Sequence, residues 1–251
     1  MACMKRYIVA NWKLYLSVAK SVQLAQQLVR FERAQKIGRD VEVILAPSML
    51  ALSAVALVLK QARSKIKIAA QDCWIADEGA FTGATSPREL RRAGASFVLI
   101  GHSERRQHGG EDDALLAKKV AAARAAGLKI IFCVGETKEE RNAGRAHSIV
   151  RGQVRGVKSE IDLLAYEPRW AIGTGLPIEP HEAAQMHEVL AKEAGNDVPI
   201  CYGGSVSEKN VAQFLSLPHT NGVLIGTASS TYASLTAIIS NARKLSERSL
   251  V

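Results

Sequence analysis

The sequence predicts an α/β protein built as a closed barrel of eight parallel strands, each followed by a helix, which is the (β/α)₈ fold. Short apolar and β-branched runs recur along the 251 residues, and stretches with helical spacing separate them. The runs are almost continuously apolar instead of alternating, as is typical of parallel strands buried on both faces. One such barrel has about 250 residues. We therefore expect a single domain that covers residues 1–251.

The expected strands and helices alternate along the whole chain. The strands are Tyr7–Asn11, Val41–Ala46, Ile66–Gln71, Phe97–Gly101, Leu128–Cys133, Ile161–Tyr166, Pro199–Gly203 and Gly222–Ile225. The helices are Val18–Lys36, Met49–Ala62, Arg88–Ala93, Asp112–Ala126, Lys138–Lys158, His181–Ala194, Glu208–Leu215 and Ala233–Arg248. The first helix carries an apolar stripe, and Gly127 follows the fourth helix as a usual cap. An open doubly wound sheet is the alternative, although no GxGxxG motif follows the first strand to support a dinucleotide-binding version.

Composition limits the class of protein. Hydrophobic residues make up 47% of the chain, yet no run approaches the roughly 20 apolar residues that span a bilayer. The four cysteines are scattered without a CxxC pair, which favours a reduced, cytoplasmic protein with no zinc site. The net charge of +9 is spread over helical stretches that also carry acids. We therefore expect neither nucleic acid nor a membrane as a partner.

Several chemically active residues stand where the strands end. Lys13, His102, Glu167, Ser205 and Gly226 each lie at or just after the carboxyl end of an expected strand. In a barrel these strand ends meet on one face, where active sites are built. We therefore expect these residues to be neighbours although they span more than 200 positions.

Residues 165–175 have the composition of a lid over an anion site. Glu167 stands at a strand end, and the tip of the segment begins at Gly173. Stiff ends with a glycine-bearing tip suit a closing lid, and glycine lets backbone N–H groups approach an anion. Gly204-Ser205 and Gly226-Thr227 end the next two strands. Three such loops on one face of a barrel predict a phosphate site.

The sequence resembles the triosephosphate isomerase family over about residues 7–245. The motifs that carry the resemblance come in the order of that family. They are Asn11-Trp12-Lys13, Gly79–Gly83, Ile100–Arg106, Cys133–Thr137, Ala165–Gly175, Tyr202–Val206 and Ile225–Ser229. The resemblance implies an isomerase of glycolysis and gluconeogenesis that interconverts dihydroxyacetone phosphate and D-glyceraldehyde 3-phosphate through an enediolate. It implies no organic cofactor and no metal.

The resemblance also implies a role for each site residue. Removal of a proton beside a carbonyl needs a base and an electrophile, which would be Glu167 and His102. The His102 ring would stay neutral at the start of a helix. Lys13 would supply positive charge, Asn11 would help to hold the enediolate, and Glu104 would support Lys13. The substrate-binding and phosphate-binding residues would be Asn11, Lys13, Gly173, Ser205, Gly226 and Thr227. The other histidines, His108, His147, His181, His187 and His219, are expected to be surface or cap residues.

The chain departs from the family pattern in its lid and phosphate loops. Thr227 stands where the family usually has glycine, and a β-branched residue is unsuited to a backbone with positive φ. Arg169 and Leu176 replace the usual lid residues. Phosphate affinity and the rates of lid closure are the properties that these changes affect.

The long segment 72–87 predicts an interface. A loop of this length usually has a function, and this one carries two large aromatic residues, Trp74 and Phe81. The resemblance implies a homodimer in which this loop docks near Lys13 of a second copy. Ala84 and Tyr15 replace residues that the family uses at that interface, which affects the strength of the dimer.

Two other functions remain open. One is a catalytically impaired or non-enzymatic barrel of the same family, although the complete set of Asn11, Lys13, His102 and Glu167 argues against it. The other is a barrel enzyme that acts on a larger sugar phosphate. The bulky Trp170 in the lid favours a small, three-carbon substrate instead.

Overall fold

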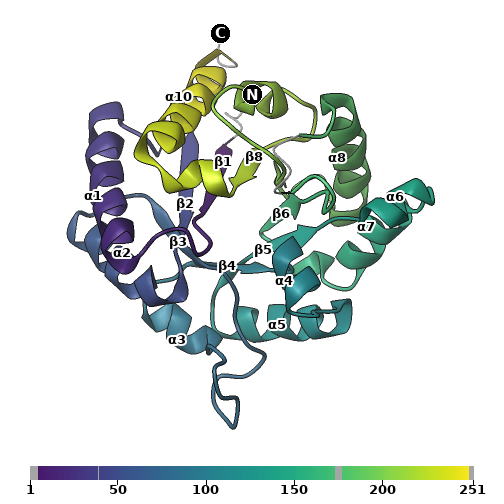
Figure 1. Cartoon of the computed structure of the whole chain (residues 1–251), viewed down its shortest axis with the longest axis horizontal. Helices are drawn as coiled ribbons and strands as arrows, with labels where there is room; N and C mark the ends of the chain where they lie inside the picture. The colour runs from purple at the N-terminus through teal and green to yellow at the C-terminus, as the bar shows by residue number, and fades with distance from the viewer. Residues whose placement is uncertain (1–4, 39, 173–176, 249–251) are drawn as a thin grey trace.

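A computed structural model describes residues 5–38, 40–172 and 177–248 and shows a closed parallel barrel with strand order β1 to β8 (Figure 1). Each strand pairs in parallel with the next, and β8 pairs with β1. The strands are β1 (Arg6–Asn11), β2 (Val41–Ala46), β3 (Lys67–Ala70), β4 (Phe97–Ile100), β5 (Lys129–Val134), β6 (Leu163–Tyr166), β7 (Ile200–Tyr202) and β8 (Gly222–Ile225). The predicted fold class is confirmed, because the predicted strands match these in order.

The helices form a ring around the barrel, as Figure 1 shows. They are α1 (Val18–Gln35), α2 (Met49–Gln61), α3 (Pro87–Arg92), α4 (Ser103–His108), α5 (Asp113–Ala125), α6 (Lys138–Asn142), α7 (Ala146–Arg155), α8 (Pro180–Ala194), α9 (Val211–Leu215) and α10 (Tyr232–Arg248). Two 3₁₀ turns, η1 (Lys158–Glu160) and η2 (Thr227–Ser230), precede β6 and follow β8. No helix within the described ranges is both long and apolar enough to cross a membrane.

The single helix predicted over Lys138–Lys158 is wrong. Helix α6 begins with a Thr137 capping box and ends at Asn142, and α7 begins only at Ala146. Gly144, between them, has φ 69°, a left-handed conformation that stops a helix and that glycine adopts without strain. The helical composition of the whole stretch hid this break.

Apolar side chains fill two layers. One set points into the barrel and comes from alternate positions of the strands, such as Val9, Ile44 and Ile131. The other set, which includes Ile8 and Ala10, packs outward against the helices. This alternation explains why the strands read as continuous apolar runs. Of the cysteines, Cys73, Cys133 and Cys201 are free and buried in these layers.

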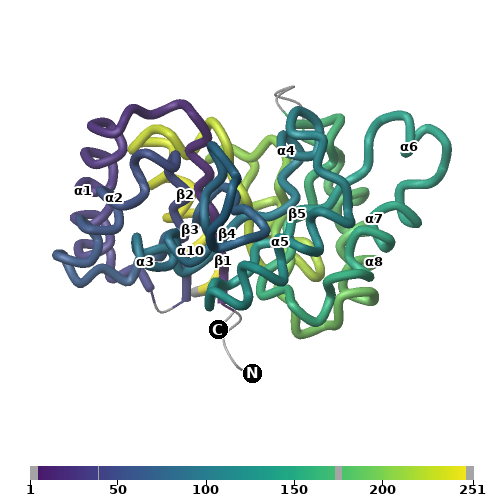
Figure 2. Tube along the Cα trace, turned by 90° about the horizontal axis from the view of Figure 1, so that it is seen from below, coloured from purple at the N-terminus to yellow at the C-terminus, as the bar shows by residue number. Residues whose placement is uncertain are grey.

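Because all eight strands run in the same direction, their carboxyl ends lie at one end of the barrel and their amino ends at the other. Figure 2 shows the barrel from the side, with α4 and the loop after β1 at the upper edge and the start of β1 toward the lower edge. The loop after β3, residues 71–86, projects away from the barrel, as Figure 1 shows. Those predicted site residues that lie within the described ranges therefore belong to the upper, carboxyl-end face.

Candidate active site

Glu167 directly follows β6 and is almost fully buried, with 1% of its surface exposed. Glycines that directly follow the two neighbouring strands, β5 and β7, make room for it. A Cβ at Gly135 would lie 1.7 Å from the Glu167 carbonyl oxygen, and a Cβ at Gly203 would lie 2.8 Å from Glu167 Cγ. These glycines allow a carboxylate to sit inside the end of a closed barrel.

His102 is placed by the turn between β4 and α4. Gly101 has φ 78°, and a Cβ there would lie 2.9 Å from the carbonyl oxygen of Cys133. The turn makes His102 the N-cap of α4, where its Nδ1 accepts a hydrogen bond of 3.2 Å from the Glu104 N–H. With Nδ1 accepting, Nε2 is the ring nitrogen that can donate a hydrogen bond into the site. The expectation that His102 opens a helix is confirmed.

His102 and Glu167 face each other across the barrel end. Nε2 of His102 lies 3.1 Å from Oε1 of Glu167. The other carboxylate oxygen accepts a 2.8 Å hydrogen bond from the backbone N–H of Ser103. Oε1 accepts no hydrogen bond of standard geometry from the described residues. One oxygen therefore holds the carboxylate in place, while the other is available to take a proton.

Lys13 and Asn11 reach the site from the loop after β1. Lys13 has φ 48°, and its N–H donates to Oδ1 of Asn11 at 3.1 Å. Its Nζ forms an ion pair of 2.6 Å with Glu104. Burial alone would raise the pKa of Glu104, but the hydrogen bond and charge of Lys13 outweigh that effect and lower this pKa. The site thus holds a fixed ion pair beside the His102 ring.

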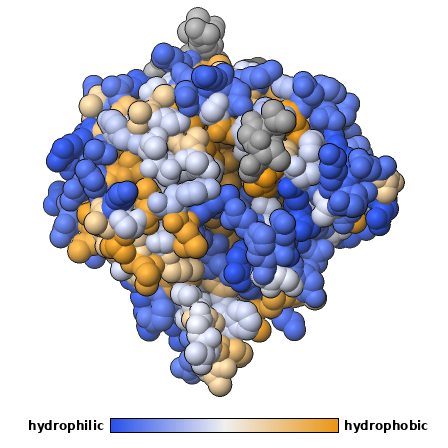
Figure 3. Space-filling model, in the orientation of Figure 1, coloured by the Kyte–Doolittle hydropathy of each residue, from blue (hydrophilic) through white to orange (hydrophobic). Residues whose placement is uncertain are grey.

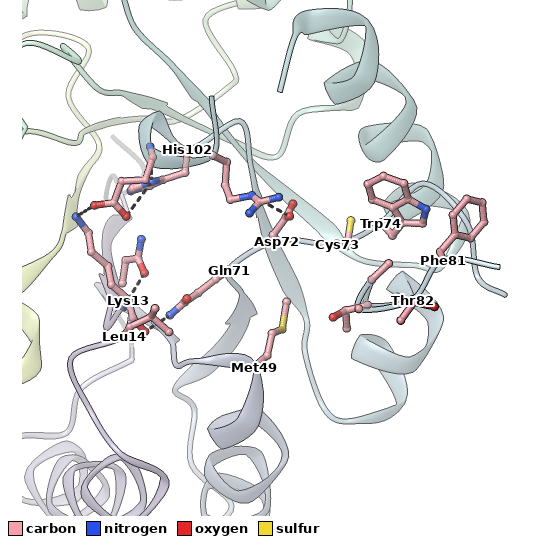
Figure 4. A pocket seen from close by; sticks show the side chains of 16 residues that line it. Lys13, Leu14, Met49, Gln71, Asp72, Cys73, Trp74, Phe81, Thr82 and His102 are labelled. Carbon is pink, nitrogen blue, oxygen red and sulfur yellow. Dashed lines mark hydrogen bonds and ion pairs between the residues drawn. The ribbon is translucent and has the colours of Figure 1, made fainter. Parts of the chain in front are cut away.

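A cavity of about 560 Å³ opens beside these residues (Figure 4). Asn11, Lys13, His102 and Glu104 line one side of it, and residues of the 71–86 loop line the other. Gln71 donates from Nε2 to the Lys13 carbonyl oxygen at 3.0 Å and so joins the two sides. No group of three His, Cys, Asp or Glu residues within the described part of the chain could hold a metal ion.

The predicted phosphate residues are brought to the same face. Gly226 lies against Lys13, since a Cβ there would lie 3.1 Å from Lys13 Cε. Ser205 Oγ donates to the Ala171 carbonyl oxygen at 3.3 Å, and this bond connects the loop after β7 to the lid segment. Gly173 and Leu176 lie outside the described residues.

Thr227 does not require a left-handed backbone. It begins the 3₁₀ turn η2 and is absent from the described non-glycine residues with positive φ. Its Oγ1 donates to Tyr15 Oη at 3.1 Å, so the first and eighth loops are joined by two residues that depart from the family pattern.

Glu136 anchors the lid segment, a role that the sequence analysis missed. Its fully buried carboxylate accepts from Trp170 Nε1 at 2.9 Å, from Tyr166 Oη at 3.2 Å and from Arg141 at 3.1 Å. Burial, together with the Glu136 charge, keeps the pKa of Tyr166 well above its usual value, so the hydroxyl remains a donor. The Arg141 guanidinium also lies 5.0 Å from the Trp170 ring centroid. Glu136 belongs to the Cys133–Thr137 motif, and this motif was the feature of the sequence that could have indicated its role.

A buried ion network supports the base of the 71–86 loop and was also missed. Lys119, with no exposed surface, bonds to Asp72 and to Glu111 at 2.7 Å each. Arg105 joins both carboxylates, at 3.1 Å and 2.6 Å. Only the three-dimensional fold brings these charges together, because α5 and the loop are distant in sequence.

The expectation that His187 is a surface or cap residue is wrong. His187 is fully buried on α8, and its Nδ1 lies 2.7 Å from Oγ1 of Thr220. Its ring packs between Tyr166 and Tyr202, with centroid distances of 5.9 Å and 6.5 Å. Burial lowers the pKa of His187 to about 3, and the charge of His219 adds to the shift.

Comparisons with known proteins agree with this geometry. The family model described as "Triosephosphate isomerase" matches residues 6–242. The chain is 37% identical to a triosephosphate isomerase from Chloroherpeton thalassium, over 95% of this chain and 99% of that protein. It is 40% identical to one from Chloroflexus aurantiacus, over 92% and 97% of the two chains. The crystal structure of triosephosphate isomerase from Bartonella henselae superposes with a TM-score of 0.83 at 30% identity, over 95% of this chain and 99% of that one.

Proposed function

The chain belongs to the triosephosphate isomerase family and interconverts dihydroxyacetone phosphate and D-glyceraldehyde 3-phosphate, and we propose that Glu167 and His102 carry out the proton transfer. The observation that carries this proposal is the environment of Oε1, one of the two carboxylate oxygens of Glu167. This oxygen is buried, accepts no standard hydrogen bond from the described residues and lies 3.1 Å from Nε2 of His102.

The proposed reaction moves one proton between two carbons and one proton between the two oxygens that these carbons carry. Glu167 takes the proton from the carbon beside the carbonyl, and the electron pair of that C–H bond forms the enediolate. The Nε2–H of His102 and the charge of Lys13 stabilise the developing oxyanion. A proton also moves from the hydroxyl oxygen on one carbon to the enediolate oxygen on the other through Nε2 of His102, which forms the new carbonyl and the new hydroxyl. The protonated Glu167 returns its proton to the neighbouring carbon, so no electron leaves the substrate.

The remaining site residues are proposed to bind and position the substrate. Glu104 holds the Lys13 ammonium through the 2.6 Å ion pair, and Asn11 fixes the backbone of the same loop. Gly173, Ser205, Gly226 and Thr227 form the phosphate site of this proposal. Backbone N–H groups suit a phosphate because they place partial positive charge beside it without adding a mobile side chain.

We further propose a cytoplasmic homodimer formed through the 71–86 loop. Phe81 is 42% exposed on this loop, and Leu14 is 89% exposed beside Lys13. Figure 3 shows hydrophobic residues gathered over the side of the molecule that carries α2, next to the base of the loop. Leu50, 85% exposed, belongs to that side. Apolar surface of this kind favours a protein–protein contact.

The Glu167→Gln variant tests the proposed base. The amide keeps the shape of the carboxylate but cannot take a proton, so kcat should fall by about 10²–10⁴-fold or more. Affinity for a phosphate-bearing substrate analogue should change far less. The matched control is Glu179→Gln, because Glu179 lies outside the site at the start of α8. A Glu167→Gln enzyme with wild-type kcat would exclude Glu167 as the base.

A further inference from the structure

A second concave, charged region lies on the amino-end face of the barrel. A cavity of about 610 Å³ is bounded by the end of α1, the end of α2 and Arg243 of α10. A neighbouring cavity of about 630 Å³ lies between α2 and α3, and both are lined by Arg63 and Ser64. The loops concerned run from a helix into β2 and β3, so they lie opposite the active site.

Two helices end at this cavity with a basic residue where glycine is usual. The N–H of Ile37 bonds to the Glu32 carbonyl oxygen, and the N–H of Ser64 bonds to that of Leu59, each at 3.0 Å. These bonds are those of a Schellman helix end, whose left-handed position is commonly glycine. Here that position is occupied by Lys36 and by Arg63, both with φ 51°.

The left-handed conformation is unfavourable for a residue with a side chain, because its Cβ comes too close to the backbone carbonyl oxygen, whereas glycine adopts it without this clash. The fold does not need a side chain at either position, since glycine would satisfy the same helix end. Two residues in this unfavourable conformation at one cavity indicate that the positive charges of Lys36 and Arg63 have a function. Both side chains are exposed.

The charges that line this cavity are unbalanced. The basic residues are Arg33, Lys36, Arg63, Lys65 and Arg243, and the acidic residues are Glu32 and Asp40. Glu32 is buried, and its two oxygens accept from Ser64 Oγ and from the Lys65 N–H. Among the described residues, Lys36, Arg63 and Lys65 form no ion pair.

Hydrogen bonds and packing hold some of the basic side chains around the cavity in place. Arg33 donates to the Ala62 carbonyl oxygen at 2.7 Å, and Arg243 donates to that of Gln35. The stem of Lys65 lies against Gly38, where a Cβ would meet Lys65 Cδ at 2.7 Å. Capping of the helix ends accounts for Arg33 and Arg243. It does not account for Lys36, Arg63 and Lys65.

We propose that this cavity binds a compact anion that carries two or three phosphate groups. Its volume is that of a small-molecule site. Lysine and arginine are the side chains that bind phosphate, and several phosphates are needed to match several cations. None of the described residues that line the cavity is aromatic, so they offer no stacking platform of the kind that single-stranded nucleic acids need.

Calorimetric titration of the full-length protein with tripolyphosphate tests the proposal. The Lys13→Ala protein serves as the background, since it weakens any binding of the probe at the substrate site. We expect one saturable site per chain in this background. A Lys36→Gly, Arg63→Gly pair should weaken that site by about tenfold or more, because two phosphate contacts are lost. The matched control, Lys118→Ala with Arg151→Ala, removes the same charge from exposed positions and should change binding less than about twofold.

Three results would overturn the proposal: no saturable binding, equal weakening by the control pair, or binding only to vesicles that contain a phosphoinositide. The last result would assign the basic surface to a lipid headgroup.

The Lys36→Gly, Arg63→Gly protein should unfold at the same temperature as the wild type or above it, since glycine relieves the left-handed strain. A lower unfolding temperature would show that both residues have a structural role. Lys65→Glu tests binding independently, because Lys65 is not in a left-handed conformation. Its isomerase kcat should stay at the wild-type value.

Discussion

The barrel holds the proposed base, Glu167, in a defined position in the absence of substrate. Its backbone continues the β5–β6–β7 hydrogen bonding, since Glu167 donates to the Val134 carbonyl oxygen at 2.7 Å. The Ser103 N–H then fixes one carboxylate oxygen from the β4 side, and the other oxygen lies 3.1 Å from Nε2 of His102. A base held in this way needs little rearrangement during the reaction, which is how enzymes lower the entropy cost of proton transfer.

At the residue scale, His187 should make stability depend on pH. The folded ring stays neutral to about pH 3, whereas an unfolded histidine binds a proton below about pH 6.5. The unfolded state thus binds more protons in that window. The stabilisation is complete above pH 6.5 and is lost as pH falls, by up to about 1.4 kcal/mol per unit.

The His187→Gln variant should remove this component of the pH dependence. Urea unfolding at several pH values between 7 and 4.5 would measure it, with the exposed His147→Gln as control. An unchanged slope in His187→Gln would show that other groups cause the acid sensitivity.

The positions of individual residues were predictable to different degrees. Glu167, His102 and Lys13 could be placed together because each follows a strand, and parallel strands of a barrel share one face. The burial of His187 could not, because it depends on Thr220, Tyr166 and Tyr202, which lie on other elements. A lone histidine on an amphipathic helix carries no sign of such neighbours.

At the element scale, the lid segment is fixed from two sides. Trp170 and Arg141 meet at the Glu136 carboxylate before the lid tip, and the Ile178 N–H donates to Tyr202 Oη at 3.3 Å after it. The two ends of the segment are therefore attached to β5 and β7. The hydrogen bonds to the Glu136 carboxylate contribute about 1.5–3 kcal/mol each, because one partner is charged.

Replacing Trp170 with phenylalanine should weaken the packed arrangement of the lid segment. The ring remains, but the hydrogen bond to Glu136 is lost, so kcat/KM should fall by about tenfold or more. Steady-state kinetics would measure this, and Glu136→Gln, which retains an acceptor for the indole, should lose less. An unchanged kcat/KM in Trp170→Phe would show that the hydrogen bond from Trp170 to Glu136 does not position the lid segment for catalysis.

The strands were predicted more reliably than the helices. Burial on both faces gives each strand a continuous apolar run, and that signal hardly depends on neighbours. The break between α6 and α7 depends on one glycine within a polar, helix-favouring stretch, where Gly144 resembles a tolerated helix glycine. The 3₁₀ turn after β8 is too short to have a periodic pattern.

At the scale of the whole molecule, the first loop is incompletely packed within one chain. Lys13 holds a left-handed conformation, and Leu14 next to it is 89% exposed. The Tyr15–Thr227 hydrogen bond joins this loop to the eighth one but is itself exposed. A second copy that covers Leu14 would stabilise the conformation in which Lys13 faces the site.

Activity should therefore fall on dilution together with dimer content. Sedimentation velocity and specific activity, measured over one dilution series, should show the two losses at the same concentration. Phe81→Ala should shift both curves to higher concentration, because it removes an exposed apolar anchor. A monomer with full specific activity would disprove this coupling.

The most direct test of the proposed chemistry is turnover in tritiated water. If Glu167 is the base, its proton exchanges with solvent while the enediolate exists, and tritium should enter carbon-bound positions of both the recovered substrate and the product. The same incubation with Glu167→Gln should show both incorporation and product formation lowered together. Product formed at the wild-type rate without carbon-bound tritium would contradict proton transfer through Glu167 and indicate direct hydride transfer between the two carbons.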